Sequence, residues 1–385
     1  MRHQHRPRLR LRVLPGLRVG VVRVSPVAVG QVPGVRGPAT PSAGSRPPAP
    51  GPWPLLDERQ RGTRFVALGA KSVLNSPTST GMDWWSVNPY VGCEYGCTYC
   101  YARFAHQYVV ECARDRGELS AETYADWRGL EGWEAFERRI FVKTGAAEVL
   151  ALTLKPARLA GRAIVIGTAT DPYQPAERRF RITRQVLERL SQFHGLHVGI
   201  ITKSPLVLRD VDVLKRLAER SDVTVHVSLI AVDAPLVRTL EVRSPLPAVR
   251  LRALERLAAA GLHAGVMMAP VVPGITDGAA QIEALLRAAK DAGARFVNAD
   301  VLRLYPAIRR RFLPVVVDHF PHLLPNYERA FDARGIVKRE YAAALQRRVA
   351  RLRRKVGVED GRTAARPHGR SVAWEEVVQQ ELALG

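Results

Sequence analysis

Three of the four cysteines in this 385-residue sequence lie within eight residues of one another. They are Cys93, Cys97 and Cys100, in the spacing Cys-x3-Cys-x2-Cys. Three thiolates spaced in this way on one loop match three corners of a [4Fe–4S] cube, which usually takes four Cys ligands, so one iron is left open. An open iron can chelate the amino and carboxylate groups of S-adenosylmethionine for one-electron cleavage. The spacing therefore predicts an iron–sulfur enzyme that generates a 5′-deoxyadenosyl radical and abstracts a hydrogen atom from a substrate.

The cysteine triplet also allows two other readings. With His106 it makes a Cys3His set typical of structural zinc, which would make the chain a zinc-dependent nucleic-acid-binding protein. With Cys112 as a fourth ligand, the chain would be an electron carrier. Against that role for Cys112, Phe104, Tyr108 and Cys112 are spaced at i, i+4 and i+8, which predicts one buried helical face with an inert thiol.

From Trp84 onward, the sequence alternates between short β-branched runs and helical patterns, as in a parallel α/β barrel or open sheet. Six strands are predicted, at Trp84–Asn88, Ala163–Thr168, His197–Thr202, Val223–Leu229, His263–Ala269 and Arg295–Val301. Helices are predicted between them, at Arg181–Gln192, Leu206–Glu219, Pro247–Ala260 and Asp277–Ala292. Glu111–Arg139 is an insertion in the first repeat, and no function is assigned to it.

Two extensions flank this core. Residues 1–56 are rich in Pro and Arg and are predicted to be disordered. Residues 306–385 are predicted to be a helical extension, because Tyr341, Leu345, Val349, Leu352 and Val356 form one apolar stripe at helical spacing. The opposite side of that helix is basic, and a short final helix is predicted over 371–384.

Composition limits the class of protein and of partner. The formal net charge is +22, and nine of these charges come from the nine Arg of residues 1–56, which hold no acidic residue. An excess of this kind favours an anionic partner such as DNA or RNA, and a protein or small-molecule substrate is the alternative. No run of eighteen apolar residues is present, so no membrane span is predicted. Four cysteines are too few for a disulfide framework, and the clear lack of a signal peptide favours a cytoplasmic protein.

The cysteine loop resembles the signature of the radical S-adenosylmethionine superfamily, in which an aromatic residue, here Tyr99, precedes the last cysteine. Other segments resemble the branch related to spore photoproduct lyase, often labelled DNA repair photolyase-like. They are Thr168–Glu177, Ile201–Ser204, Val227–Leu229 and Ala269–Asp277. The resemblance implies a partial (β/α)6 barrel over residues 57–305, with the cluster on the loop after the first strand. It also implies a reductant such as a flavodoxin or ferredoxin.

The resemblance assigns residues to the cofactors by position. It implies that Cys93, Cys97 and Cys100 bind the cluster and that Tyr99 lies near the adenine. Further residues at strand ends are implied to contact S-adenosylmethionine. Thr170 and Asp171 would contact its methionine end, and Lys203 its carboxylate. Ser228 would contact the carboxylate or the ribose, and Pro270–Gly274 would lie beside the adenine. Tyr173, Gln174 and Glu177 lie on the second-strand loop and are expected to face the substrate.

One departure from the branch concerns the hydrogen donor. Spore photoproduct lyases use a cysteine near the second-strand segment to return a hydrogen atom, and here that strand reads Gly167-Thr168-Ala169-Thr170. The resemblance therefore supports radical generation more strongly than lesion repair, and both repair and modification of a nucleic acid stay open.

Overall fold

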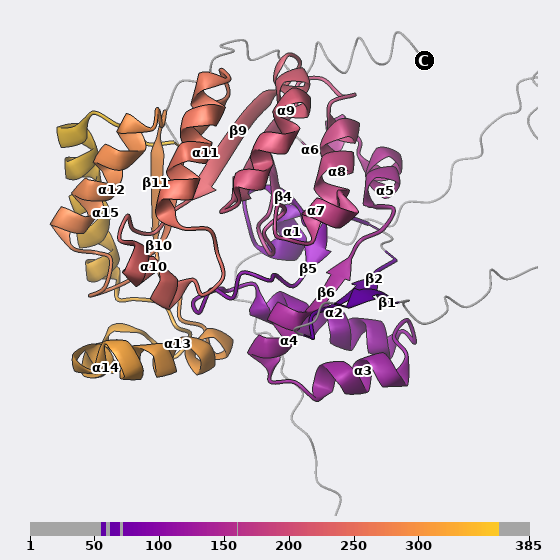
Figure 1. Cartoon of the computed structure of the whole chain (residues 1–385), viewed down its shortest axis with the longest axis horizontal. Coiled ribbons are helices and arrows are strands. Elements are labelled where there is room, and N and C mark those ends of the chain that lie inside the picture. Colours follow the sequence, from indigo (N-terminus) through magenta and orange to yellow (C-terminus); the bar gives the residue numbers. More distant parts are fainter. Residues whose placement is uncertain (1–54, 59–61, 70–71, 160, 362–385) are drawn as a thin grey trace, which may run out of the picture. The chain divides into compact units, whose positions relative to one another are not determined.

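The computed structural model describes residues 55–58, 62–69, 72–159 and 161–361 (Figure 1). The extension predicted over 1–56 lies outside these residues as far as residue 54, and the first strand, β1, begins at Leu55. The predicted helix over 371–384 also lies outside the described residues.

The larger sheet has seven strands in the order β11-β10-β9-β8-β7-β4-β3. Six of them are parallel, and β3 pairs antiparallel with β4 at the edge. Their bounds are β3 Leu74–Asn75, β4 Trp85–Val87, β7 Ile164–Ile166, β8 His197–Thr202, β9 Asp222–Ser228, β10 His263–Val271 and β11 Val297–Val301. The six predicted strands are confirmed, and the open strand order is that of a partial (β/α)6 barrel.

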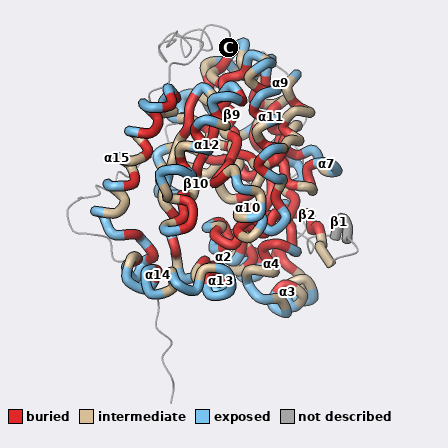
Figure 2. Tube along the Cα trace, turned by 60° about the vertical axis from the view of Figure 1, so that its left-hand side comes forward, coloured by how far each residue is buried: buried red, intermediate tan, exposed pale blue. Residues whose placement is uncertain are grey.

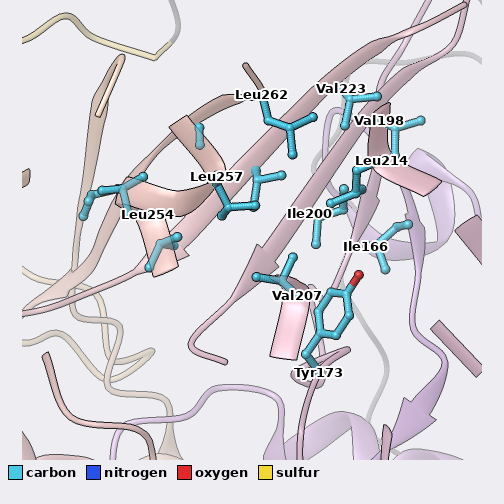
Figure 3. Close-up of a cluster of buried hydrophobic side chains, with 14 of the residues drawn as sticks. Ile166, Tyr173, Val198, Ile200, Val207, Leu214, Val223, Leu254, Leu257 and Leu262 are labelled. Atoms are coloured by element: carbon cyan, nitrogen blue, oxygen red, sulfur yellow. The ribbon is translucent and has the colours of Figure 1, made fainter. Parts of the chain in front are cut away.

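Helices follow the parallel strands and cover the sheet. They are α7 Glu177–Phe180, α8 Ile182–Leu190, the 3-10 helix η1 Pro205–Asp210, α9 Val211–Ala218, α10 Ala234–Leu240, α11 Pro247–Ala259 and α12 Ala279–Asp291. Figure 3 shows Ile200 and Val223 of the strands beside Val207, Leu214 and Leu257 of the helices, and all five belong to one buried cluster. Each fully buried side chain of this size stabilises the fold by about 1.5–3 kcal/mol.

A second, smaller sheet was not predicted. It has the order β1-β2-β6-β5, and its strands are β1 Leu55–Glu58, β2 Arg64–Ala67, β5 Tyr90–Val91 and β6 Arg139–Val142. The helices α2 Arg103–Asp115, α3 Ala121–Arg128 and α4 Gly132–Arg138 accompany it. The insertion predicted over Glu111–Arg139 thus supplies the end of α2, both following helices and the start of β6. A separate buried cluster around Val110, Trp127 and Phe141 holds this sheet and its helices together.

Three short helices near the edge of the larger sheet complete the region before α7. They are α1 Pro77–Thr80, α5 Ala146–Thr153 and α6 Pro156–Leu159. Of these, α5 packs against α8, and Ala146 and Leu150 on it are completely buried in the main core.

The residues after β11 are helical, as predicted. They form α13 Pro306–His319, the 3-10 helix η2 Pro321–Leu323, α14 Leu324–Ala330 and α15 Arg339–Val356. On α15, Leu345, Val349, Leu352 and Val356 are buried and Tyr341 is partly buried, so the predicted stripe is confirmed (Figure 2). Among the described helices, none has the length and apolar character needed to cross a membrane.

The prediction for α2 is wrong. Phe104 and Tyr108 do share one face, but they are 55% and 69% exposed, and Cys112 on the same face is only partly buried. The buried residues of this helix are instead Arg103, His106, Val110 and Ala113. Arg103 and His106 can lie on the buried face because each has hydrogen-bond partners there, so the burial of their polar groups is tolerated.

Candidate active site

The cysteine loop lies between the two sheets, after β4 of the larger one and β5 of the smaller one. Cys93 and Cys97 are buried and Cys100 is partly exposed. Two long-range backbone bonds fix the loop: Cys93 N donates to the Phe136 carbonyl at 3.0 Å, and Thr98 N donates to the Leu240 carbonyl at 2.9 Å. Gly92 has a φ of 93°, a left-handed conformation that glycine adopts without strain.

The loop after β7 supports the cysteine loop from the side of the barrel strands. The Thr170 hydroxyl donates to the Gly92 carbonyl at 2.6 Å, and Gln174 Nε2 donates to the same carbonyl at 3.2 Å. Glu94 N donates to Gln174 Oε1 at 3.0 Å. The polar groups of Thr170 and Gln174 are therefore committed to holding the loop backbone.

Asp171 joins the ends of two neighbouring strands. Its carboxylate accepts from Tyr173 N at 2.9 Å within its own turn, and from the Thr202 hydroxyl at 2.7 Å and Lys203 N at 2.8 Å at the end of β8. Burial raises the pKa of Asp171, against these hydrogen bonds, which favour its charged form. The residue thus positions the backbone of Lys203.

Lys203 extends from the end of β8 toward the cysteine loop. Its side chain is 16% exposed, and Nζ lies 4.0 Å from Glu241 Oε1 and 5.9 Å from the centre of the Tyr99 ring. Burial alone would lower the pKa of Lys203, but Cys97 and Glu241 nearby outweigh it and the pKa is raised. Because the ammonium is charged and its Nζ makes no hydrogen bond within the described ranges, an anionic acceptor would fit beside it.

Two charged residues missed by the sequence analysis lie beneath these groups. Glu241 and Arg250 are both fully buried and form an ion pair. Glu241 also accepts hydrogen bonds from the Tyr99 hydroxyl and from Ser244 Oγ, the latter at 2.8 Å. Arg250 donates to the Ser228 carbonyl at 2.9 Å. The pair therefore links the cysteine loop to the end of β9.

One sequence signal pointed to this pair. Arg250 lies on the apolar face of α11, among Ala253, Leu254 and Leu257. A charge on an otherwise apolar helical face indicates a buried partner. The identity of that partner has no local signal, because Glu241 comes from a different segment.

Ser228, the last residue of β9, is 3% exposed, and its hydroxyl makes no hydrogen bond in the part of the chain that the structure describes. Pro270–Gly274 lies at the carboxyl end of β10, whose last two residues are Pro270 and Val271. In contrast, the expectation that Tyr173, Gln174 and Glu177 face the substrate is wrong, because all three are completely buried. Tyr173 lies in the main core (Figure 3), and Glu177 pairs with Arg209 at 2.7 Å.

The donor set, three cysteine thiols on one loop, is of the kind that holds three corners of an iron–sulfur cube. No three His, Cys, Asp or Glu side chains among the described residues are grouped so that they could hold one metal ion. Three thiolates that bind three different irons of a cube lie farther apart than ligands of one zinc. Burial raises the pKa of Cys93 and raises that of Cys97 to about 12, so metal binding there must displace protons.

Both alternative fourth ligands are placed elsewhere. His106 Nε2 bonds to the Arg139 carbonyl at 2.8 Å, and its Nδ1 accepts from Trp127 Nε1 at 3.2 Å, so neither nitrogen is available to zinc. Burial lowers the pKa of His106 to about 4. Cys112 lies nine residues beyond the start of α2, about 13 Å along the helix axis, and is out of reach of a cluster on the loop.

Comparison with known proteins identifies a family and relatives. The family model described as "Radical SAM superfamily" matches residues 87–298. An uncharacterised protein of Mycobacterium bovis is 31% identical over 293 residues, which are 76% of this chain and 80% of that protein. An uncharacterised protein of Methanocaldococcus jannaschii is 27% identical over 213 residues, which are 55% of this chain and 70% of that protein.

Solved structures with a similar fold include a mutant spore photoproduct lyase with bound S-adenosylmethionine and dinucleoside spore photoproduct. The similarity has a TM-score of 0.53 at 14% identity and covers 76% of this chain and 79% of that one. A second mutant of the lyase gives a TM-score of 0.53 at 14% identity and covers 77% and 81% of the two chains. These values show a shared fold.

Proposed function

The chain belongs to the radical S-adenosylmethionine superfamily, whose members use a [4Fe–4S] cluster and S-adenosylmethionine, and we propose that it cleaves S-adenosylmethionine reductively and abstracts a hydrogen atom from a substrate at the open end of its barrel. Cys93, Cys97 and Cys100 would hold the cluster. When bound, the cluster supplies one electron for cleavage of S-adenosylmethionine. The observation that carries the proposal is the charged Lys203 ammonium, which lies beside the cysteine loop without a hydrogen bond in the described residues.

The residues around the loop have separate functions in this proposal. Lys203 would bind the carboxylate of S-adenosylmethionine, and the unbonded hydroxyl of Ser228 would bind its carboxylate or ribose. Tyr99 would contact the adenine, because its hydroxyl is fixed by Glu241 and its ring is held in one place. Thr170 and Asp171, which were expected to contact the methionine end, would instead act as positioning residues, since their polar atoms are already bonded to Gly92 and to the end of β8.

The open end of the barrel would hold the substrate and exclude water. Tyr101 lies there, with its hydroxyl donating to the Thr168 carbonyl. The exclusion matters because an alkyl radical must meet the chosen C–H bond before it meets another hydrogen donor. Nucleic acid is the substrate class that the charge favours, because Arg347, Arg351 and Arg354 on α15 are exposed.

Lesion repair by the route of spore photoproduct lyase would need a hydrogen donor at the end of β7. Thr168 and Ala169 stand there, and Asn88 is hydrogen-bonded to both of them, to the Thr168 hydroxyl at 3.1 Å and from Ala169 N at 2.8 Å. Neither residue has a thiol. We therefore propose modification of the substrate, by a lyase or transferase reaction, in preference to hydrogen return by a cysteine.

The experiment is anaerobic reconstitution with iron and sulfide, then dithionite reduction with S-adenosylmethionine and chromatography for 5′-deoxyadenosine. Wild type should bind iron and release 5′-deoxyadenosine, and Cys97→Ala should lose both. Cys112→Ala is the matched control and should behave as wild type, because Cys112 lies far along α2. Release of 5′-deoxyadenosine by Cys97→Ala, or zinc in place of iron in the purified wild type, would refute the proposal.

A further inference from the structure

Three arginines surround one buried carboxylate on the side of the cysteine loop that faces the smaller sheet. The carboxylate is Glu137 of α4, whose side chain is 1% exposed. Arg103 of α2 donates to it at 2.8 Å, and Arg243, from the turn after α10, pairs with it as well. Arg311 of α13 approaches to 4.0 Å. Four separate segments therefore converge on this carboxylate.

The positive charge of this cluster exceeds its negative charge. No second carboxylate pairs with Arg103, Arg243 or Arg311 in the ranges that the structure describes, so three guanidinium groups face one carboxylate. The Nε atoms of Arg103 and Arg311 are buried and have no hydrogen-bond partner among these residues. The Arg243 and Arg311 side chains are 43% and 21% exposed. The cluster therefore presents an unneutralised positive charge to solution.

Hydrogen bonds connect the cluster directly to the cysteine loop. Arg103 Nη2 donates to the Cys97 carbonyl at 2.7 Å, and Arg243 Nε donates to the Glu94 carbonyl at 2.6 Å. A Cβ at Gly96 would lie 2.8 Å from Arg243 Nη2 and 3.0 Å from Glu137 Oε2, so the arginines pack closely against the loop.

The opposite side of the loop faces the barrel. Gly92 and Tyr99 of the loop bond there to Thr170 and Glu241. The cysteine loop thus separates the arginine cluster from the strand ends. A molecule bound at the cluster is close to the cysteines and is kept away from the open end of the barrel.

Aromatic side chains border the cluster. Arg311 stacks over the Trp133 ring at 4.3 Å, and Phe104, the neighbour of Arg103, is 55% exposed. Figure 2 shows α2, α4 and α13 close to one another, and α2 packs against both α4 and α13. Exposed aromatic residues beside arginines are the combination that contributes most binding energy at protein interfaces. We call the surface of Trp133, Arg243 and Arg311, together with the exposed Phe104 of the adjoining helix α2, the arginine face.

We propose that the arginine face is the docking surface for an acidic one-electron carrier protein, an inference that rests on the proposed function. The unneutralised charge selects an acidic partner and accelerates its encounter. A small interface suits a transient redox contact. One electron leaves the carrier and enters the iron–sulfur site through the adjoining loop, and no atom is transferred. Nucleic acid is the other polyanion, but on this face it would be separated from the strand ends where the substrate reacts.

The test compares two sources of electrons for cleavage of S-adenosylmethionine. One is dithionite, which needs no docking surface, and the other is a flavodoxin reduced by NADPH and its reductase. The variant is Arg311→Gln combined with Phe104→Ser, since neither side chain bonds to the cysteine loop. We expect the second-order rate constant of its flavodoxin-driven reaction to fall about tenfold and to lose part of its salt dependence. The dithionite-driven rate should equal that of wild type.

Control variants separate a specific effect from a general one. Arg256→Gln removes an exposed charge from α11 and should change neither rate. Arg311→Lys keeps the charge and should retain most of the flavodoxin-driven rate. The single variant Phe104→Ser keeps the test valid if Arg311→Gln disturbs the loop and lowers the iron content. Phe104 is exposed and outside the ion-pair network, so its substitution should leave the loop intact.

Other outcomes would overturn the inference. If the flavodoxin-driven rate stays at the wild-type value in every variant, the arginine face is not the docking surface. Unchanged flavodoxin rates with weaker binding of single-stranded DNA would assign the face to nucleic acid. Failure of wild type to cleave S-adenosylmethionine with dithionite would refute the proposed function instead, and flavodoxin binding, measured by quenching of flavin fluorescence, would still decide whether the arginine face binds the carrier.

Discussion

Glu241 carries a buried charge that four neighbours balance in different ways. Arg250 pairs with it, Lys203 lies 4.0 Å away, and Tyr99 and Ser244 donate hydrogen bonds to it. Burial would raise its pKa, but Arg250 and Lys203 outweigh this, so the pKa of Glu241 is lowered and the residue stays ionised. Lys203 is the neighbour with the longest contact, 4.0 Å, so in the proposed function it is the one that would bind an anion while Arg250 holds the buried carboxylate.

The buried ring of His106 makes the stability of the fold depend on pH. Its pKa falls from 6.5 to about 4 in the folded chain because the ring is buried. The unfolded chain therefore takes up a proton at higher pH than the folded chain, and stability is lost as pH falls from about 6.5 toward 4. We expect wild type to lose about 2 kcal/mol more unfolding free energy between pH 7 and pH 5 than His106→Gln, measured by urea denaturation. Equal losses of unfolding free energy in wild type and His106→Gln would contradict the lowered pKa of the buried His106 ring.

Which residues the sequence could identify depended on local pattern. The cysteine spacing and the strand-end segments with Asp171 and Lys203 are contiguous, so their placement was predictable. The bonds of Thr170 and Glu241 were not, because their partners lie 78 and 142 residues away in the chain. Burial of Gln174 and Glu177 also depends on such distant partners, and their position on the second-strand loop alone wrongly suggested that they face the substrate.

At the level of elements, the six parallel strands were predictable because they are short apolar runs rich in β-branched residues, and all but the first are followed directly by a helix. The smaller sheet was not. Its strand β5 has two residues, and β2 pairs with β6 across 75 residues, as in the register of Phe65 with Ile140. Neither length nor alternation distinguishes such strands from loops. The buried face of α2 was misassigned because aromatic residues and polar residues both recur along it at helical spacing, and only tertiary partners decide which face packs.

The turn between β5 and the first cysteine should be intolerant of any side chain. A Cβ at Gly92 would lie 2.8 Å from the Phe136 carbonyl oxygen, and φ is +93°. We expect Gly92→Ala to lower the unfolding free energy by about 2–4 kcal/mol and to reduce the iron bound after reconstitution. Gly117→Ala is the control, because φ there is +68° with no atom within 4 Å, so only the backbone cost of about 1 kcal/mol applies. Equal effects of the two substitutions on stability would show that the close contact does not matter.

At the scale of the whole molecule, the net charge of the chain overstates the positive charge that its surface offers to an anionic partner. Arg250 is fully buried and the Arg103 side chain is 3% exposed, so both belong to internal networks. Exposed arginines occur on several elements, among them α11, α15 and the arginine face. A basic composition therefore predicted the sign of a partner's charge, but the location of the surface required the fold.

We propose that the chain comprises an extension over 1–56, a barrel core over 57–305 and helices over 306–385. The compact unit begins at Pro50. A chain that starts at Pro50 should therefore keep the melting temperature and iron content of the full chain. A chain that starts at residue 70 loses β1 and β2 and should melt at lower temperature, because Phe65 and Val66 are buried. Calorimetry of the three chains makes the comparison, and a lower melting temperature for the chain from Pro50 would contradict the proposed boundary.

The pairing of Thr98 with Leu240 also has a consequence for biosynthesis. The amide of Thr98 bonds to a carbonyl 142 residues later in the chain, and the bridge from Cys97 to Glu241 spans two residues more. At about 5–20 residues per second, a ribosome needs on the order of ten seconds to cover that interval. During this time the cysteines have left the ribosome but lack the shape of their loop. We therefore expect the cluster of the proposed function to be loaded after most of the barrel has been translated, and thiol-protecting conditions during synthesis to raise the yield of loaded protein.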